Sequence, residues 1–210
     1  MTAPERPFEL ASRLAARLCH DFSGAAGAIA SGLDLLSDPT APVAPDEALA
    51  LARDGAQGLA AQIAFARAAF GAGGEPFAND ALETLARSLF VSIRPTLEWI
   101  VDPASVPAAP GRVLLNFVQL AAGAAATGGL VRAQARQGPD GWRLRVEAVG
   151  PRVKLQPEVA AGLEGGGPGA GLAGRWVQAA FVRALVVETA GRCAVRAEAE
   201  RIVFEAIVPG

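Results

Sequence analysis

Apolar residues recur at helical spacing in the first third of the chain. From residue 8 to residue 37 they form one stripe at about 100° per residue, made of Leu10, Leu14, Leu18, Phe22, Ala25, Ile29, Leu33 and Leu36. A second stripe begins behind Asp46 and Glu47, which suit a helix N-terminus, and contains Ala52, Ala56, Leu59, Ile63 and Phe70. The proline-rich turn after residue 37 and the glycines at 71, 73 and 74 end these helices. The pattern therefore predicts an antiparallel helical hairpin.

Two helices alone would leave one apolar side open to water. The hairpin must therefore pack against the rest of its own chain or against a second copy. A homodimeric four-helix bundle is the simplest solution. We expect the bundle to bury Leu14, Leu18, Ile29, Leu33, Leu59 and Ile63, each of which contributes roughly 1.5–3 kcal/mol when fully buried.

After residues 72–78 the pattern changes to shorter elements. Alternating apolar and polar residues predict strands at 97–101, 130–137, 142–149, 193–198 and 202–208. Helical spacing predicts helices at 80–90, with Asn79 as the cap, at 112–126 behind Pro110-Gly111, and at 175–189. The run Gly138-Pro139-Asp140-Gly141 predicts a β-hairpin turn, and the glycine-rich stretch 162–174 predicts a flexible loop.

Helices and mostly antiparallel strands in this order favour an α+β fold with one layer of each. We expect two domains. Residues 1–74 would form the helical hairpin, and residues 75–210 would form an α/β sandwich.

Composition narrows the class of protein. The 210 residues are 51% hydrophobic and 19% charged, so the chain can form a sizeable core and is not disordered. A net charge of −2 argues against nucleic acid as a partner. No charge-free apolar run reaches the roughly 18 residues of a membrane span, and the first residues lack the features of a signal peptide. We expect a cytoplasmic protein.

The reactive side chains exclude several chemistries. His20 is the one histidine, and with Cys19 and Cys193 as the two cysteines it cannot form a usual zinc site within one chain. The one lysine, Lys154, does not follow a glycine loop, so a Walker A phosphate site is absent. Two cysteines in a chain of this length are typical of reduced thiols. Any histidine chemistry must therefore use His20.

His20 lies about 160° around the first helix from the apolar stripe, so we expect its ring to face solvent. Small residues share that face with it: Ala16, Gly24, Gly27 and Ser31. Each of the two glycines costs about 1 kcal/mol of helix propensity relative to alanine, which is consistent with a flat approach to the imidazole. Arg13 and Arg17 lie on the same face, and Asp21 follows His20 directly.

Each of these features also has a structural explanation. A lone surface histidine is often without function, glycines within helices also permit close packing, and the arginines could form an ordinary solvated face. If His20 is functional, its chemistry is nucleophilic, because a neutral imidazole can attack an acyl phosphate and hold the phosphoryl group as a phosphoramidate. Arg13 and Arg17 would offset charge on the phosphoryl oxygens, and Asp21 would orient the other ring nitrogen.

The run Cys19-His20-Asp21-Phe22 and residues 27–36 resemble the phosphoacceptor helix of the ChpT-type histidine phosphotransferases of alphaproteobacteria. The resemblance to the dimerisation helix of histidine kinases is looser. In the second half, Leu97-Glu98-Trp99, residues 112–117 and Gly128-Gly129-Leu130-Val131 resemble the same family's degenerate kinase-like domain. The resemblance spans roughly residues 8–208. It implies a dimeric four-helix bundle followed by a degenerate histidine-kinase ATPase domain of the Bergerat-like type.

The chain departs from active histidine-kinase ATPase domains at two positions. In the register of the resemblance, Leu120 replaces the asparagine that holds magnesium. The adenine-binding aspartate would fall within residues 148–152, which contain no aspartate. Residues 165–172 resemble a remnant of the ATP-lid glycines, although a flexible linker would have the same composition. The resemblance therefore implies a carrier of phosphate that does not bind ATP.

The function implied by the resemblance is that of a homodimeric histidine phosphotransferase. His20, with Asp21 beside it, would take a phosphoryl group from the receiver domain of a hybrid histidine kinase and pass it to response regulators. The docking face would comprise Arg13, Ala16, Arg17, Gly24, Gly27 and Ser31. We expect no cofactor or metal in this chain, because the divalent ion would sit in the receiver domain, and neither nucleic acid nor membrane as a partner. Two alternatives stay open, namely a histidine kinase with atypical ATP motifs and a dimeric scaffold that acts without phosphorylation.

Overall fold

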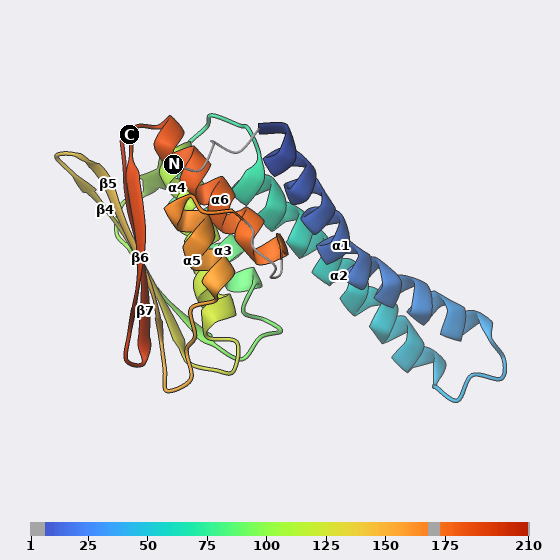
Figure 1. Cartoon of the computed structure of the whole chain (residues 1–210). Helices are drawn as coiled ribbons and strands as arrows, with labels where there is room; N and C mark the ends of the chain where they lie inside the picture. Colours follow the sequence, from blue (N-terminus) through green and yellow to red (C-terminus); the bar gives the residue numbers. More distant parts are fainter. Residues whose placement is uncertain (1–6, 168–172, 210) are drawn as a thin grey trace.

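Two long helices form an antiparallel hairpin at the N-terminal side of the protein. The computed structural model describes residues 7–167 and 173–209, and its first two elements are α1 (Pro7–Ser37) and α2 (Pro45–Phe70). The far end of the hairpin extends away from the remaining elements (Figure 1). At the turn, the Asp38 carboxylate accepts hydrogen bonds from the hydroxyl (2.6 Å) and the backbone N–H (2.8 Å) of Thr40. Both hydrogen bonds lower the pKa of Asp38, and the bond from the hydroxyl has the larger effect. The predicted hairpin is confirmed.

Small residues allow the two helices to cross closely. A Cβ added at Gly32 would lie 2.7 Å from the backbone nitrogen of Ala52, and one added at Gly55 would lie 3.0 Å from the Ile29 side chain. Real Cβ atoms do not approach a neighbouring backbone so closely, so Gly32 is the residue that this crossing requires. The glycines of the hairpin therefore serve two purposes, since Gly24 and Gly27 lie in open space.

The rest of the chain is built on a five-stranded mixed sheet. Its order is β2-β4-β5-β7-β6, formed by β2 (Thr96–Val101), β4 (Leu130–Gly138), β5 (Gly141–Val149), β7 (Arg201–Val208) and β6 (Arg192–Glu198). The β2–β4 pair is parallel and the other pairs are antiparallel. A second sheet pairs β1 (Phe77–Ala78) with β3 (Ser105–Val106).

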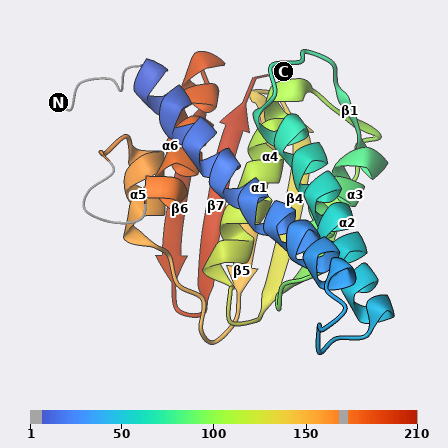
Figure 2. The same ribbon diagram turned by 90° about the vertical axis from the view of Figure 1, so that its right-hand side faces the viewer.

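Helices cover one face of the large sheet. They are α3 (Asn79–Ser88), α4 (Ala108–Ala124), α5 (Pro157–Glu164) and α6 (Ala173–Glu188), and Figure 2 shows them in front of the strands. In α4, 12 of the 17 residues are buried, because this helix lies between the sheet and the hairpin. Phe117 on α4 packs against Phe204 on β7, with ring centroids 5.7 Å apart. The predicted α+β sandwich is confirmed.

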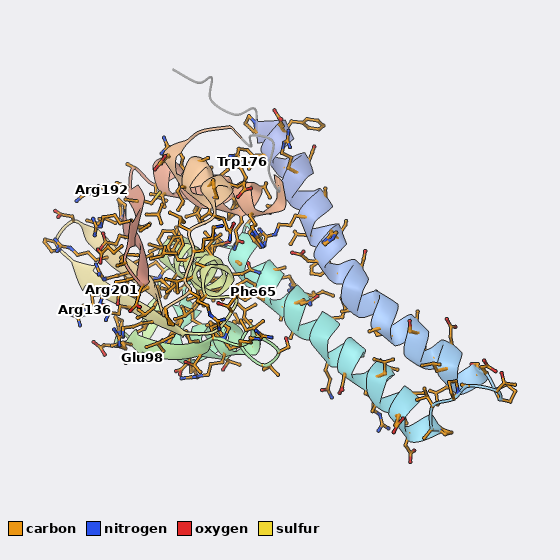
Figure 3. The ribbon with its side chains drawn as sticks, turned by 60° about the horizontal axis from the view of Figure 1, so that its bottom comes forward. Phe65, Glu98, Arg136, Trp176, Arg192 and Arg201 are labelled. Atoms are coloured by element: carbon orange, nitrogen blue, oxygen red, sulfur yellow. The ribbon has the colours of Figure 1, made fainter. Side chains whose placement is uncertain are left out.

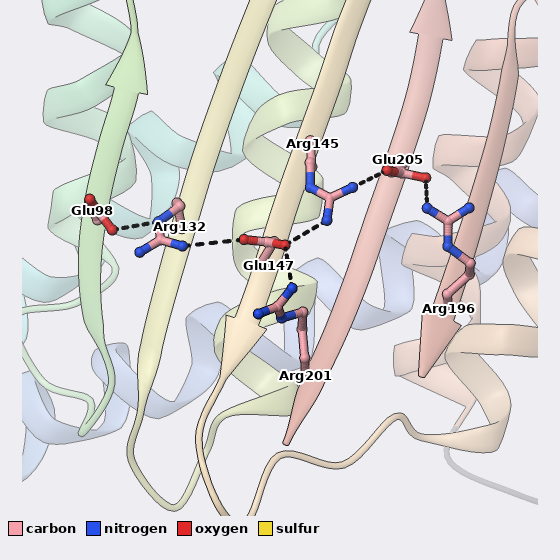
Figure 4. A network of polar contacts seen from close by, with 7 residues as sticks. All are labelled: Glu98, Arg132, Arg145, Glu147, Arg196, Arg201 and Glu205. Carbon is pink, nitrogen blue, oxygen red and sulfur yellow. Dashed lines mark hydrogen bonds and ion pairs between the residues drawn. The ribbon is translucent and has the colours of Figure 1, made fainter. Parts of the chain in front are cut away.

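The uncovered face of the sheet carries a chain of ion pairs (Figure 4). Glu147, which is 8% exposed, pairs with Arg145 at 2.7 Å, Arg132 at 3.5 Å and Arg201 at 3.8 Å. On one side this network of ion pairs continues from Arg132 to Glu98. On the other side it continues from Arg145 through Glu205 to Arg196. Oppositely charged neighbours across strands stabilise a sheet face that no other element covers.

The last turns of α2 pack into the core of the α/β part. Phe65 and Ala69 belong to the same buried cluster as the sheet and α4, and Figure 3 shows Phe65 where α2 meets the other helices. The fully buried Asn116 of α4 donates to the Ala69 carbonyl (3.0 Å) and accepts from Gln178 of α6 (3.0 Å). The base of the hairpin is thus fixed to the body, while its far end is not.

Several predicted boundaries and roles are wrong. Asn79 does not cap α3, because its side chain donates to the Val101 carbonyl (2.6 Å) and accepts from Trp99 (2.9 Å). Pro110-Gly111 lies inside α4 rather than before it, since proline is tolerated in a first turn, where its missing N–H has no helical partner.

The glycine-rich stretch 162–174 is only partly a loop. Gly162 is buried in α5, a helix that the sequence analysis did not predict, and a Cβ there would lie 2.7 Å from the Cβ of Ala179 on α6. Residues 168–172, which include much of the predicted lid remnant, lie outside the described residues. No helix in the described part of the chain combines the length and apolar content needed to cross a bilayer.

Candidate functional site

His20 stands on the exposed side of α1, as its helical position predicted. Its side chain is 90% exposed, and its Nδ1 lies 3.4 Å from Oδ1 of Asp21. With the proton on Nδ1, this nitrogen donates to the carboxylate and leaves the Nε2 lone pair free. The site therefore presents an oriented and accessible imidazole nitrogen.

Arg17 connects Asp21 with the body of the protein. Its Nε donates to Oδ2 of Asp21 at 3.3 Å, and its Nη1 donates to the carbonyl of Gly174 on α6 at 2.6 Å. The Arg17 side chain is only 15% exposed. A chain of polar contacts thus runs from the body of the protein through Arg17 and Asp21 to His20. Through Arg17, the Gly174 carbonyl of α6 helps to fix the orientation of Asp21.

Arg13 is also engaged within the chain. It pairs with Glu9 at 2.8 Å, and its guanidinium lies 5.9 Å from the ring centroid of Trp176, in cation–π range. Leu10 and Leu14 pack against the same Trp176 cluster on α6, which Figure 3 places beside α1. Leu14, predicted for the dimer interface, therefore packs within its own chain. Arg13 and Arg17 both carry positive charge near His20, but neither side chain is free.

The small residues around His20 leave its approach open. Ala16, Gly24, Gly27 and Ser31 are all exposed. A Cβ added at Gly24 or Gly27 would meet nothing within 4 Å, so close helix packing does not explain these two glycines. They leave open space on the face of α1 that carries His20.

A cleft of about 1020 Å³ opens beside His20. One wall comes from α1 and α2, with His20, Gly24, Gln62 and Phe65 among its residues, and the opposite wall comes from residues 88–93. In that segment Val91 is 87% exposed and Ile93 is 41% exposed. The sequence analysis missed this wall, because residues 88–93 and α1 line one cleft only in the folded chain. The apolar pair Val91 and Ile93, placed between a helix and a strand, was the one available signal.

The described residues hold no group of three or more histidine, cysteine or acidic side chains placed to bind a metal ion. Leu120, at the position of the kinase asparagine, is 6% exposed and offers no ligand atom. The adenine-site positions include Ala148, which is fully buried in the sheet. These residues do not fit a magnesium nucleotide of the kinase type.

Comparisons with known proteins identify the class. Residues 79–201 match the sequence model of the family described as histidine phosphotransferase C-terminal domain, and the chain belongs to this family. It is similar to protein phosphotransferase ChpT of Brucella abortus (strain 2308), with 28% identity over 202 residues, 94% of this chain and 95% of the relative. The family places the protein in phosphotransfer, in two-component phosphorelays.

Solved structures agree on the architecture. A structure described as a bacterial phosphotransferase has a TM-score of 0.84 and 27% identity, and the match covers 97% of this chain and 98% of that one. Full-length ShkA in complex with AMPPNP matches with a TM-score of 0.50 and 21% identity, over 94% of this chain and 45% of that one. The second likeness concerns the fold alone. The expected resemblance to the ChpT type and the expected fold, which the histidine kinase shares, are confirmed.

Proposed function

We propose that His20 is the phosphoacceptor of a homodimeric histidine phosphotransferase. The observation that carries the proposal is an imidazole that is 90% exposed, with Nδ1 facing Asp21, at the edge of the cleft. Nε2 attacks the phosphorus of an aspartyl phosphate in a receiver domain. A P–N bond forms, the P–O bond to the aspartate breaks, and the carboxylate leaves. The reverse step passes the phosphoryl group to the aspartate of a second receiver.

The docking face comprises Ala16, Gly24, Gly27 and Ser31 around His20, with positive charge from Arg13 and Arg17. We extend it to the opposite wall of the cleft, because exposed apolar residues beside a polar nucleophile are typical of protein contacts. Val91 and Ile93 would then contact the same receiver domain as the face around His20. The divalent ion that accompanies the transfer belongs to the receiver, and the partners are receivers of a hybrid histidine kinase and of response regulators.

The hairpin supports the dimer. Leu33, Leu36, Leu51 and Ile63 are large apolar side chains that are 38–51% exposed, and they lie on the part of the hairpin that the body does not cover. Pairing two hairpins would bury them in a four-helix bundle. In this proposal residues 1–74 carry phosphate and dimerise, whereas residues 75–210 hold the base of the hairpin and add a docking surface.

The test is phosphoryl transfer from isolated receiver domains. A panel of receivers carrying ³²P is incubated with the wild-type chain, His20→Gln and Cys19→Ala, the last being an exposed neighbour of His20. We expect acid-labile label on wild type and Cys19→Ala and none on His20→Gln. Label on His20→Gln would overturn the assignment of His20. A relay that runs unchanged in cells with His20→Gln would favour a scaffold instead.

A further inference from the structure

A second, smaller cavity lies between α1, α4, α6 and the loop that follows β5. Its volume is about 220 Å³. Three cationic side chains from three separate elements line it: Arg17 of α1, Lys154 of the loop and Arg175 of α6. Among the described residues, no aspartate or glutamate lines it. In a chain with a net charge of −2, three cations of which only Arg17 pairs with an acid give this cavity a local excess of positive charge.

Two of these cations have no partner among the described residues. There, neither Lys154 nor Arg175 forms a side-chain hydrogen bond or an ion pair. Like charges that converge without a counter-charge raise the free energy of the folded state, and a bound anion would remove that cost. Arg17 donates to Asp21 and Gly174, and its remaining N–H groups are available, because a guanidinium has five donors.

Neutral groups complete the lining. Gln119 accepts a hydrogen bond from Gln178 through Oε1 (2.6 Å), which leaves its amide N–H₂ group as a donor toward the cavity. Leu120 and Phe204 contribute apolar surface. Leu120 has no oxygen atom for a divalent metal, and no carboxylate is present to help hold one, so the lining suits an anion that binds without a metal.

We propose that this cavity binds a small molecule bearing a phosphate or diphosphate group, independently of divalent metal. Arginine and lysine are the side chains that recognise phosphate oxygens, arginine through a bidentate fork and lysine as a point charge. The cavity is smaller than the roughly 300–1,000 Å³ of sites for drug-sized ligands, which favours a diphosphate-sized group over a complete nucleoside triphosphate. Arg17 and Gln119 also line the His20 cleft. A bound anion would therefore contact the same guanidinium that holds Asp21. The proposal does not depend on the role of His20 as phosphoacceptor.

The test uses inorganic pyrophosphate as the probe, added to the full chain at constant ionic strength in the presence of EDTA. Binding is measured by isothermal titration calorimetry and as a thermal shift, since a ligand that binds the folded state raises its stability. We expect saturable binding by wild type and equally by His20→Gln. Lys154→Ala/Arg175→Ala should bind more weakly by roughly tenfold or more, because charge-assisted hydrogen bonds are lost. The matched control is Arg136→Ala/Arg152→Ala, which removes the same charge outside the cavity and should bind like wild type.

Two further arms test the ligand class. Citrate at equal ionic strength should give no saturable shift, and neither should ATP with magnesium. Absence of saturation with pyrophosphate, or equal weakening in both double variants, would overturn the proposal, because the effect would then reflect general charge. Equal binding of citrate would exclude phosphate selectivity. Binding abolished by EDTA and restored by magnesium would exclude a metal-free site.

Discussion

Two apolar helices of this protein, α1 and α4, differ in how many of their residues are buried. Only one of the 31 residues of α1 is buried, and that residue is Gly32, whereas 12 of the 17 residues of α4 are buried. Both segments are rich in leucine and alanine. In the folded protein α4 is part of the core, whereas most of α1 is exposed or only partly buried. We therefore expect the exposed apolar residues of the hairpin to serve contacts with other molecules.

The same contrast occurs within one helix. Phe65 and Ile63 are two residues apart on α2, yet Phe65 is 3% exposed and Ile63 is 40% exposed. Phe65 faces the body, and Ile63 faces the side that we assign to the second copy. Substitutions at these two positions should therefore separate the stability of the fold from the stability of the dimer.

The largest effect is expected at Phe65. Phe65→Ala removes a buried ring from the junction of α2 with the core, and such truncations cost about 3–5 kcal/mol. Urea unfolding at a fixed protein concentration measures this change. Gln62→Ala, an exposed neighbour on the same helix, should change the free energy of unfolding by less than about 0.5 kcal/mol. A loss at Phe65 no larger than that of the control would mean that the hairpin base does not belong to the core.

Ile63→Asp should break the dimer without unfolding the chain. Each copy would bring a charge into the bundle, and burying an unpaired carboxylate opposes association strongly. We expect the dissociation constant to rise about 100-fold or more, equivalent to roughly 2.7 kcal/mol. Analytical ultracentrifugation measures it, with Ala50→Asp as the control, an exposed position more than three turns away. Wild type that is a monomer at micromolar concentration would refute the proposed bundle.

Much of the fold could be predicted because helical and strand periodicities differ. The helical hairpin, the β-hairpin turn at residues 138–141 and five strands follow from that pattern. Helix α5 was missed because glycine is typical of loops. In the structure, Gly162 allows α5 to approach Ala179 of α6 closely. The parallel β2–β4 pair was also missed. The helix between these strands supplies the crossover that parallel strands need, so the order of elements already contained this information.

The candidate site could be predicted only where it is local to α1. The solvent-facing position of His20 and the open space at Gly24 depend on helix geometry alone. The partner of Arg17 is Gly174, 157 residues further along the chain, and periodicity carries no signal of such a contact. The wall of the cleft at Val91 is likewise a product of tertiary packing. Local sequence therefore predicts the exposed position of the proposed nucleophile, and the fold determines how that side chain is held and approached.

Gly24→Leu should block transfer through bulk. Leucine favours the helix, and a Cβ at that position meets no atom within 4 Å, so the variant should fold and dimerise normally. The receiver would lose its close approach to His20, and we expect transfer to slow by roughly 30-fold, about 2 kcal/mol. Ala81→Leu, at an exposed position of α3 that lines neither cavity, is the control. Transfer by Gly24→Leu at the rate of the control would exclude this face as the docking site.

The reactivities of the two cysteine thiols should differ in the same way as the exposure of the hairpin and the body. Cys19 is exposed on α1, whereas burial raises the pKa of Cys193 on β6 and the charge of Arg183 offsets this only in part. Alkylation needs the thiolate, so a raised pKa lowers the reactive fraction at any pH below it. We expect iodoacetamide to modify Cys19 about tenfold faster than Cys193 at pH 7.5, measured by peptide mass spectrometry. Equal rates would contradict the partial burial of Cys193. Docking of a receiver should protect Cys19 and leave Cys193 unchanged.

The smallest effect is expected at Arg17, and it separates two roles for positive charge near His20. If Arg17 attracts an acidic receiver through solvent, its effect should disappear at high salt, because screening at 0.1 M already acts over about 10 Å. The guanidinium is only 15% exposed and is bonded to Asp21 and Gly174, which favours a positioning role. We expect Arg17→Gln to slow transfer by about threefold, with the same deficit in 0.05 M and 0.5 M NaCl. Arg53→Gln, an exposed arginine of α2 outside the cleft, should transfer at the wild-type rate in both. A deficit that vanishes in 0.5 M NaCl would assign Arg17 to electrostatic steering and leave Asp21 to orient His20 without it.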